Sequence, residues 1–128
     1  MRTLYDHRGR PVAYVDRDDT SIYLYGGDPV AWLSRGSVYA YSGRYLGWTQ
    51  NGWFYDRTGK PAFFTPEATG GPAKPAKQAK PARGGRGARP SRGAREARPA
   101  RPARSTTWSD LSGEAYFDQS PTTIQQFV

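Results

Sequence analysis

One short pattern occurs four times between residues 4 and 64, and this repetition limits the fold more than any other feature of the chain. The pattern reads apolar residue, Tyr, three residues, Gly, any residue, Pro, apolar residue, small residue, aromatic residue. An internal repeat of this kind indicates one supersecondary unit used four times. The repeated tyrosines are 18, 16 and 16 residues apart, and the copies occupy residues 4–14, 22–32, 38–48 and 54–64.

Each copy of the pattern predicts a β-hairpin. Residues 6–9 and 56–59 begin with Asp and end with Gly, which suits a type I turn followed by a glycine at positive φ and a bulge. The proline two residues later has no N–H, so it belongs at a strand edge or at a bulge. The sequence therefore predicts an all-β domain at residues 1–69, with eight short strands in an up-and-down course. The hairpins are joined by segments rich in turn-forming residues, namely residues 17–20, 34–37 and 50–52.

Four such hairpins must pack together, because a single two-stranded hairpin is only marginally stable in water. The most economical arrangement of four similar units is around a pseudo-fourfold axis, which also protects short strand edges. Each aromatic ring at the end of a copy buries about 150–250 Å², worth roughly 4–6 kcal/mol before entropy is subtracted. We therefore expect the structural core to contain Tyr14, Trp32, Trp48 and Phe64.

A second repeat, with a period of three residues, fills residues 72–104. In all eleven triplets the middle residue is small and the third is basic, and proline also recurs every nine residues, from Pro72 to Pro99. Three residues per turn is the period of polyproline II, which places the basic side chains along one edge of an extended chain. These basic residues, the candidate polyanion-binding residues, are Lys74, Lys77, Lys80, Arg83, Arg86, Arg89, Arg92, Arg95, Arg98, Arg101 and Arg104.

Charge is divided unevenly along the chain, whose formal net charge is +8. Residues 1–69 carry 8 basic and 7 acidic side chains, residues 70–104 carry 11 and 1, and residues 105–128 carry none and 3. So basic a segment favours binding to a polyanion, with nucleic acid as the leading candidate, through counterion release and without reading bases. Two other interpretations stay open: a disordered, solvated linker, and a structural segment that packs along the β domain or through its centre.

An aromatic patch follows the triplets at residues 105–117. It contains Trp108, Tyr116 and Phe117, and such a patch has no reason to follow a free tail unless it docks. We expect it to dock on its own β domain or on a neighbour's, and the second case would make the protein a homo-oligomer. Residues 118–128 are mostly polar, and we expect a frayed end or an interface peptide there.

The residues that catalysis or metal binding needs are sparse. The chain has no cysteine, which excludes disulfides and thiolate metal sites. Its one histidine, His7, lies in a predicted turn, and Asp6 and Asp56 are better explained as turn caps than as a catalytic pair. The acidic cluster at residues 16–19 lacks the later glutamate and the glycine of an EF-hand loop. We therefore expect no enzyme activity, no cofactor and no metal.

The repeats and the triplets resemble those of a known family, the bacterial "4-fold beta flower" domain. The resemblance covers about residues 3–117 and implies a four-hairpin all-β module, but it carries over no catalytic or binding residue because the family is named for its fold. Copy three departs from the pattern with Tyr45 in place of proline, and copy four with Phe63 in place of a small residue. Besides the first two copies and the triplets, the resemblance rests on Leu46-Gly47-Trp48, Gly70-Gly71-Pro72 and Trp108-Ser109-Asp110.

These features predict a non-enzymatic binding or scaffold module whose triplet segment engages polyanions. One alternative is a structural homo-oligomer in which the triplets and the Trp108 patch are assembly elements. No apolar run is long enough to span a membrane or to act as a signal peptide, so we expect a cytoplasmic protein. Another alternative is a carbohydrate-binding module, because residues 52–60 are similar to aromatic cell-wall-binding repeats; its stacking surface would contain Tyr23, Tyr25, Tyr39, Tyr41 and Trp53.

Overall fold

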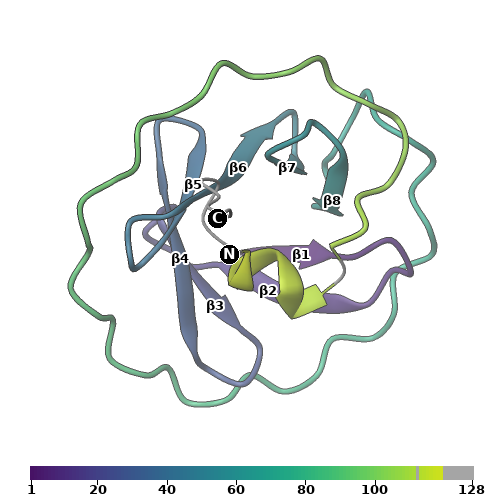
Figure 1. Ribbon diagram of the computed structural model, residues 1–128. Helices are drawn as coiled ribbons and strands as arrows, with labels where there is room; N and C mark the ends of the chain where they lie inside the picture. The colour runs from purple at the N-terminus through teal and green to yellow at the C-terminus, as the bar shows by residue number, and fades with distance from the viewer. Residues whose placement is uncertain (112, 120–128) are drawn as a thin grey trace.

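The computed structural model describes residues 1–111 and 113–119 and shows a closed barrel of eight antiparallel strands in sequence order (Figure 1). Each strand pairs with the next, and β8 closes the barrel on β1 through the pair Tyr5 and Phe64. The predicted all-β fold of four hairpins is confirmed. The strands are β1 (Arg2–Tyr5), β2 (Pro11–Val15), β3 (Ser21–Leu24), β4 (Pro29–Ser34), β5 (Ser37–Ala40), β6 (Tyr45–Gln50), β7 (Trp53–Asp56) and β8 (Pro61–Phe64).

In every hairpin turn the N–H of the repeated glycine donates to the carbonyl oxygen of the residue three positions earlier, which is aspartate in the first and fourth hairpins. In the first hairpin Gly9 has a φ of 79°, and its N–H donates to the carbonyl oxygen of Asp6 at 2.9 Å. The carboxylate of Asp6 accepts the N–H groups of Arg8 and Arg10, both at 2.9 Å, so this aspartate caps its own turn. The strand register shifts just before the turn, and the same irregularity recurs in the other three hairpins. The four hairpins are therefore one local structure used four times.

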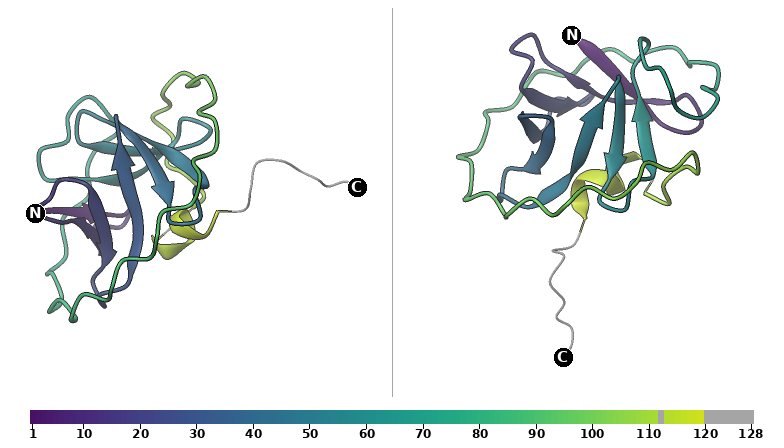
Figure 2. Two further views of the ribbon diagram at one scale, coloured as in Figure 1. Left: turned by 90° about the vertical axis from the view of Figure 1, so that its left-hand side faces the viewer. Right: turned by 90° about the horizontal axis from the view of Figure 1, so that it is seen from above.

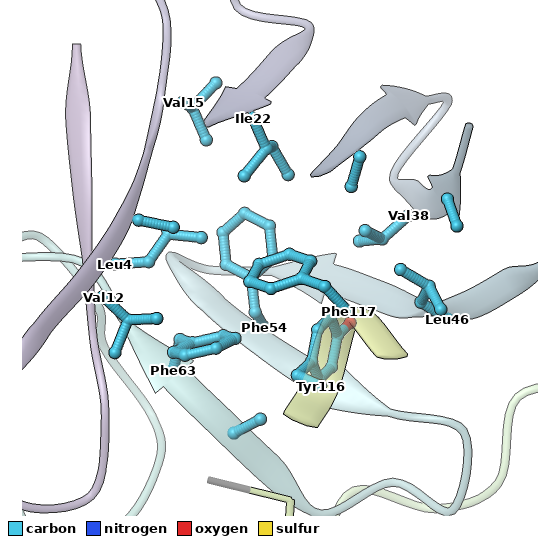
Figure 3. Packing of buried hydrophobic residues seen from close by; sticks show 14 residues of the cluster. Leu4, Val12, Val15, Ile22, Val38, Leu46, Phe54, Phe63, Tyr116 and Phe117 are labelled. Carbon is cyan, nitrogen blue, oxygen red and sulfur yellow. The ribbon is translucent and has the colours of Figure 1, made fainter. Parts of the chain in front are cut away.

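The interior of the barrel is filled by the apolar residue that precedes each repeated tyrosine. Leu4, Ile22, Val38 and Phe54 are fully buried there, together with small and aliphatic residues of the neighbouring strands (Figure 3). Successive side chains of a strand point to opposite faces of the sheet, so the repeated tyrosines lie on the outer face of the barrel.

The four aromatic residues expected in the structural core are buried, but they lie on this outer face and not in the interior cluster. Their exposed fractions are 5% or less. Each ring packs against the repeated tyrosine of the next hairpin, to which it is also paired across the strands. The stacked pairs and their centroid distances are Tyr14–Tyr23 at 5.8 Å, Trp32–Tyr39 at 5.2 Å, Trp48–Tyr55 at 5.3 Å and Phe64–Tyr5 at 5.4 Å.

A short 3-10 helix, η1 (Gly113–Asp118), lies across one end of the barrel (Figures 1 and 2). It places Tyr116 and Phe117 in the interior cluster, with their rings 5.2 and 5.6 Å from the ring of Phe63 (Figure 3). The hydroxyl of Tyr116 donates to the carbonyl oxygen of Tyr55 at 2.9 Å. The sequence did not predict this helix, because six residues are too few to show helical periodicity.

The helix also explains one departure from the repeat. The small position of the pattern is alanine in the first two copies, but Phe63 occupies it in the fourth, where it stacks on Phe117. In the third copy this position is Gly47, where a Cβ would overlap the carbonyl oxygen of Tyr55 and crowd the hydroxyl of Tyr116. The interior is therefore asymmetric at the positions that receive η1.

Gln119, the first residue after η1, packs on the barrel. It belongs to residues 118–128, where we expect a frayed end or an interface peptide, but its side chain is buried. Its side-chain amide donates to the carbonyl oxygens of Leu46 and Tyr116, both at 2.8 Å. The expectation for residues 120–128 lies outside the described residues.

Candidate polyanion-binding belt

Residues 72–104, which we call the belt, run around the outside of the whole barrel (Figures 1 and 2). No strand or helix is assigned to them, and their polyproline II conformation stays a prediction. A backbone N–H in or directly after the belt donates to the carbonyl oxygen of the turn glycine of every hairpin. The four hydrogen bonds are Gln78 to Gly9 at 2.8 Å, Gly87 to Gly27 at 2.9 Å, Glu96 to Gly43 at 2.8 Å and Ser105 to Gly59 at 2.9 Å.

The four donors are nine residues apart, so three triplets correspond to one hairpin. The same spacing occurs in the closest approaches between the belt and the turns. A Cβ added to any of the four turn glycines would overlap a belt carbonyl oxygen, and these oxygens belong to Ala76, Gly85, Ala94 and Ala103. The turn glycine thus has two tasks, because it takes a positive φ and also gives the belt room to approach the turn.

Two glycines of the belt itself also lie so close to the barrel that a Cβ would not fit. A Cβ at Gly84 would overlap the carbonyl oxygen of Gly26, and a Cβ at Gly93 would overlap that of Ser42. Their N–H groups donate to the carbonyl oxygens of Tyr25 and Tyr41, both at 2.7 Å. The equivalent belt positions beside the first and fourth hairpins are prolines, which have no N–H to donate.

The eleven basic residues of the belt are all exposed. Three of them, also nine residues apart, place a guanidinium over the aromatic ring that ends a repeat. The distances from the guanidinium carbon to the ring centroid are 5.6 Å for Arg83 over Tyr14, 4.4 Å for Arg92 over Trp32 and 5.6 Å for Arg101 over Trp48. Burial raises the pKa of Tyr14, although Arg86 and Arg83 oppose the shift. These are cation–π contacts, so part of the basic charge of the belt also covers hydrophobic surface.

The ring of the fourth repeat, Phe64, is covered by the aromatic patch instead. Trp108 is half-buried and contacts the rings of Phe64 and Trp53 at 6.3 and 5.6 Å. The Lys74 ammonium, nine residues before Arg83, donates to the carbonyl oxygens of Pro66 and Ala68. Trp108, Tyr116 and Phe117 therefore all contact the barrel of their own chain, and assembly of several copies stays a prediction.

In the described part of the chain, ion pairs neutralise the belt beside a single turn. Beside the β2–β3 turn, Arg86 pairs with Asp16 at 2.8 Å and Arg89 pairs with Asp18 at 2.9 Å. Burial raises the pKa of Asp18, but hydrogen bonds from Ser21 and Thr20 and the charge of Arg89 lower it to about 2. Beside the β4–β5 turn, Arg95 donates to the neutral hydroxyl of Ser34 at 2.7 Å. Within the described part of the chain no ion pair involves Lys77, Lys80, Arg98 or Arg104.

The one acidic residue of the belt has a structural partner. In the third hairpin Tyr45 replaces the proline of the repeat, so this strand start has an N–H that the other hairpins lack. That N–H donates to the carboxylate of Glu96 at 2.7 Å. The departure of the third repeat and the single acidic triplet therefore explain each other.

The remaining candidate residues do not form a second site. The five aromatic side chains of the predicted sugar-stacking surface have exposed fractions of 9% or less. His7 lies beside Trp108, with ring centroids 6.2 Å apart. Among residues 1–111 and 113–119, no cluster of three histidine or acidic side chains could hold a metal ion, and no described helix is long and apolar enough to cross a membrane.

The fold and the belt define a small all-β protein: a closed barrel of four hairpins encircled by a basic segment of its own chain. The chain belongs to the family described as 4-fold beta flower protein, whose sequence profile matches residues 2–117. Searches of curated proteins and of solved structures found no match to this chain.

Proposed function

We propose that this protein is a non-enzymatic binding module whose belt engages polyanions, nucleic acid above all, without sequence specificity. The observation that carries the proposal is that eleven cations remain exposed on a segment attached to all four hairpins. An attached segment loses less conformational entropy on binding than a free basic tail does, so more of the electrostatic attraction contributes to affinity.

The side of the belt beside hairpins three and four is where a polyanion would bind most strongly. Arg86 and Arg89 already have carboxylate partners, whereas Arg98 and Arg104 have none among the described residues. A nucleic-acid duplex that meets one side of a round barrel would contact a few belt cations at most. For about four phosphate contacts, the logarithm of the affinity falls with the logarithm of salt with a slope of about −3.6.

A pair of double variants tests this proposal. R98Q/R104Q and R86Q/R89Q remove the same net charge but from opposite parts of the belt. We expect R98Q/R104Q to reduce the salt slope for a mixed-sequence DNA duplex by about 2, because two phosphate contacts are lost, and R86Q/R89Q to change it much less. Fluorescence anisotropy between 50 and 300 mM salt measures both slopes.

Two outcomes contradict the proposal. Equal slopes for the two variants would mean that only the net charge matters and that the belt has no preferred side. Binding of the wild-type protein that persists in 0.5 M salt would remove counterion release as the source of affinity.

A further inference from the structure

We propose that Arg35, Arg95 and Arg98 form a binding site for one phosphate group at the β4–β5 turn. The inference deepens the proposed function and rests on it, because it names the point of the belt at which the phosphate backbone of a nucleic acid is held. The three arginines come from two segments that are 60 residues apart in sequence, the turn between two hairpins and the belt that passes over it.

Arg35, Arg95 and Arg98 line a hollow of about 250 Å³ together with Ser34, Tyr39 and Glu96. Arg98 also lines a neighbouring hollow of about 290 Å³. The hollow is therefore bordered by three cations and one anion. The anion, Glu96, accepts the backbone N–H of Tyr45, so its carboxylate has a partner in the barrel.

The internal symmetry of the barrel provides a comparison for this hollow. Arg86 and Arg95 are nine residues apart and occupy equivalent places on the belt, and each reaches the residue two positions after a terminal aromatic. That residue is Asp16 beside Arg86, which makes an ion pair, but Ser34 beside Arg95, which makes a neutral hydrogen bond. The belt arginine at this position is thus neutralised by a carboxylate in the first unit and keeps its positive charge in the next.

The backbone of Arg35 is a second, independent observation. Among the described residues, three other than glycine have a positive φ, one in each of the turns that join the hairpins: Asp19 at 57°, Arg35 at 52° and Asn51 at 53°. Asp and Asn adopt this conformation more readily than other residues, whereas arginine adopts it at a cost. Arg35 also has no ion-pair partner among the described residues. Arg35 and Gly36 form the two-residue connection between the paired residues Ser34 and Ser37, and such a turn requires a positive φ at both positions. The turn explains the conformation but not the choice of arginine, because asparagine or aspartate would adopt it with less strain.

The chemistry of the hollow suits a phosphate group better than a carboxylate. Guanidinium groups donate two parallel hydrogen bonds to neighbouring oxygens, and a phosphate group offers enough oxygens for several such donors at once. The hydroxyl of Ser34 lies at the same place and can donate a further hydrogen bond.

The test uses the full-length chain and inorganic phosphate as the probe, at constant ionic strength. Arginine Nε–H signals are followed by NMR for the wild type, R35N, R98Q and the control R17N, which removes the same charge from the β2–β3 turn. We expect saturable shifts of Arg35, Arg95 and Arg98, about tenfold weaker phosphate binding in R35N and R98Q, and wild-type binding in R17N, because each lost contact is a charge-assisted hydrogen bond. We also expect R35N to unfold at higher urea concentration than the wild type, because asparagine relieves the strain.

Three results overturn the site: parallel shifts of all belt arginines without saturation, equal phosphate affinity in R35N and R17N, or wild-type affinity in R98Q. Anisotropy with a DNA duplex on the same variants separates this inference from the proposed function. Duplex binding without phosphate saturation rejects only the site, whereas phosphate saturation without duplex binding rejects only the nucleic-acid function.

Discussion

Two adjacent glycines of the belt provide a matched test of whether the belt is held on the barrel. A Cβ at Gly84 would overlap the carbonyl oxygen of Gly26, whereas a Cβ at Gly85 would meet no atom within 4 Å. Neither glycine has a positive φ, so substitution strains the backbone at neither position. Gly84→Ala and Gly85→Ala therefore differ in one respect, the clash with the barrel.

The size of the effect follows from the hydrogen bonds at this place. To relieve the clash, the belt must move away from the turn, which breaks the bonds from Gly84 to Tyr25 and from Gly87 to Gly27. Two such bonds contribute about 1–3 kcal/mol to the free energy of unfolding. Gly85→Ala reduces the entropy of the unfolded chain and is expected to be neutral or to stabilise by up to about 1 kcal/mol. The two variants should thus differ by at least about 1 kcal/mol.

Urea denaturation followed by tryptophan fluorescence measures this difference, and hydrogen exchange at residues 84 and 87 locates it. We expect both amides to lose protection in Gly84→Ala only. Equal stability and equal protection in the two variants would refute the attachment of the belt to the second hairpin, and the segment would then be a solvated tether.

Two further predictions concern the length of the belt and the η1 contact. Deletion of residues 88–90 keeps the three-residue phase but shortens the belt between Gly87 and Glu96 from nine residues to six. Six residues span at most about 21 Å, whereas nine residues of polyproline II span about 28 Å. We expect the amide of Gly87 or of Glu96 to lose its protection from hydrogen exchange, and protection of both amides would contradict this. Burial raises the pKa of Tyr116 well above its usual value, so above pH 10 the unfolded chain ionises first and stability should fall by about 1.4 kcal/mol per pH unit from this residue. Tyr116→Phe should lower the free energy of unfolding by about 1 kcal/mol at pH 8, because it removes the hydrogen bond to Tyr55. In urea denaturation between pH 10 and 11, the stability of this variant should fall less steeply than that of the wild type. Equal pH dependence of the two proteins would contradict the raised pKa of Tyr116.

The hairpins could be predicted from the sequence because their determinants are local. Aspartate at residue 6, glycine at residue 9 and proline at residue 11 each restrict the backbone within a single turn. The direction of the terminal aromatics was harder, because a hydrophobic ring is buried equally well by an interior and by a segment that covers the outside. Without the belt in place, Tyr14 and Trp32 would be exposed on the barrel surface, so their burial depends on Arg83 and Arg92, which lie 69 and 60 positions later in the sequence.

The phosphate site could not be predicted from the sequence. An arginine in a turn is not unusual in a sequence. Arg35 differs from other turn arginines only in its φ of 52° and in its place beside the belt, and both are known from the structure alone. The attachment of the belt did have a sequence signal, the proline every nine residues from Pro72 to Pro99. The nine-residue spacing could be read from the sequence, but its meaning could not. It matches the number of belt residues needed to pass one hairpin, and that number depends on the circumference of the folded barrel.

The two periods of the belt also change how its charge is understood. A three-residue period alone makes all eleven cations equivalent, as one charged edge. A nine-residue period divides them into three kinds, because each hairpin meets the belt once every three triplets. Arg83, Arg92 and Arg101 each cover a ring. Arg86 and Arg95 reach the residue two positions after a ring, and Arg89 and Arg98 lie beside the turn that joins two hairpins. Since the turn residues differ from unit to unit, the same belt arginine is neutralised by Asp18 in one place and left beside Arg35 in the next, so the barrel determines which cations can bind a ligand.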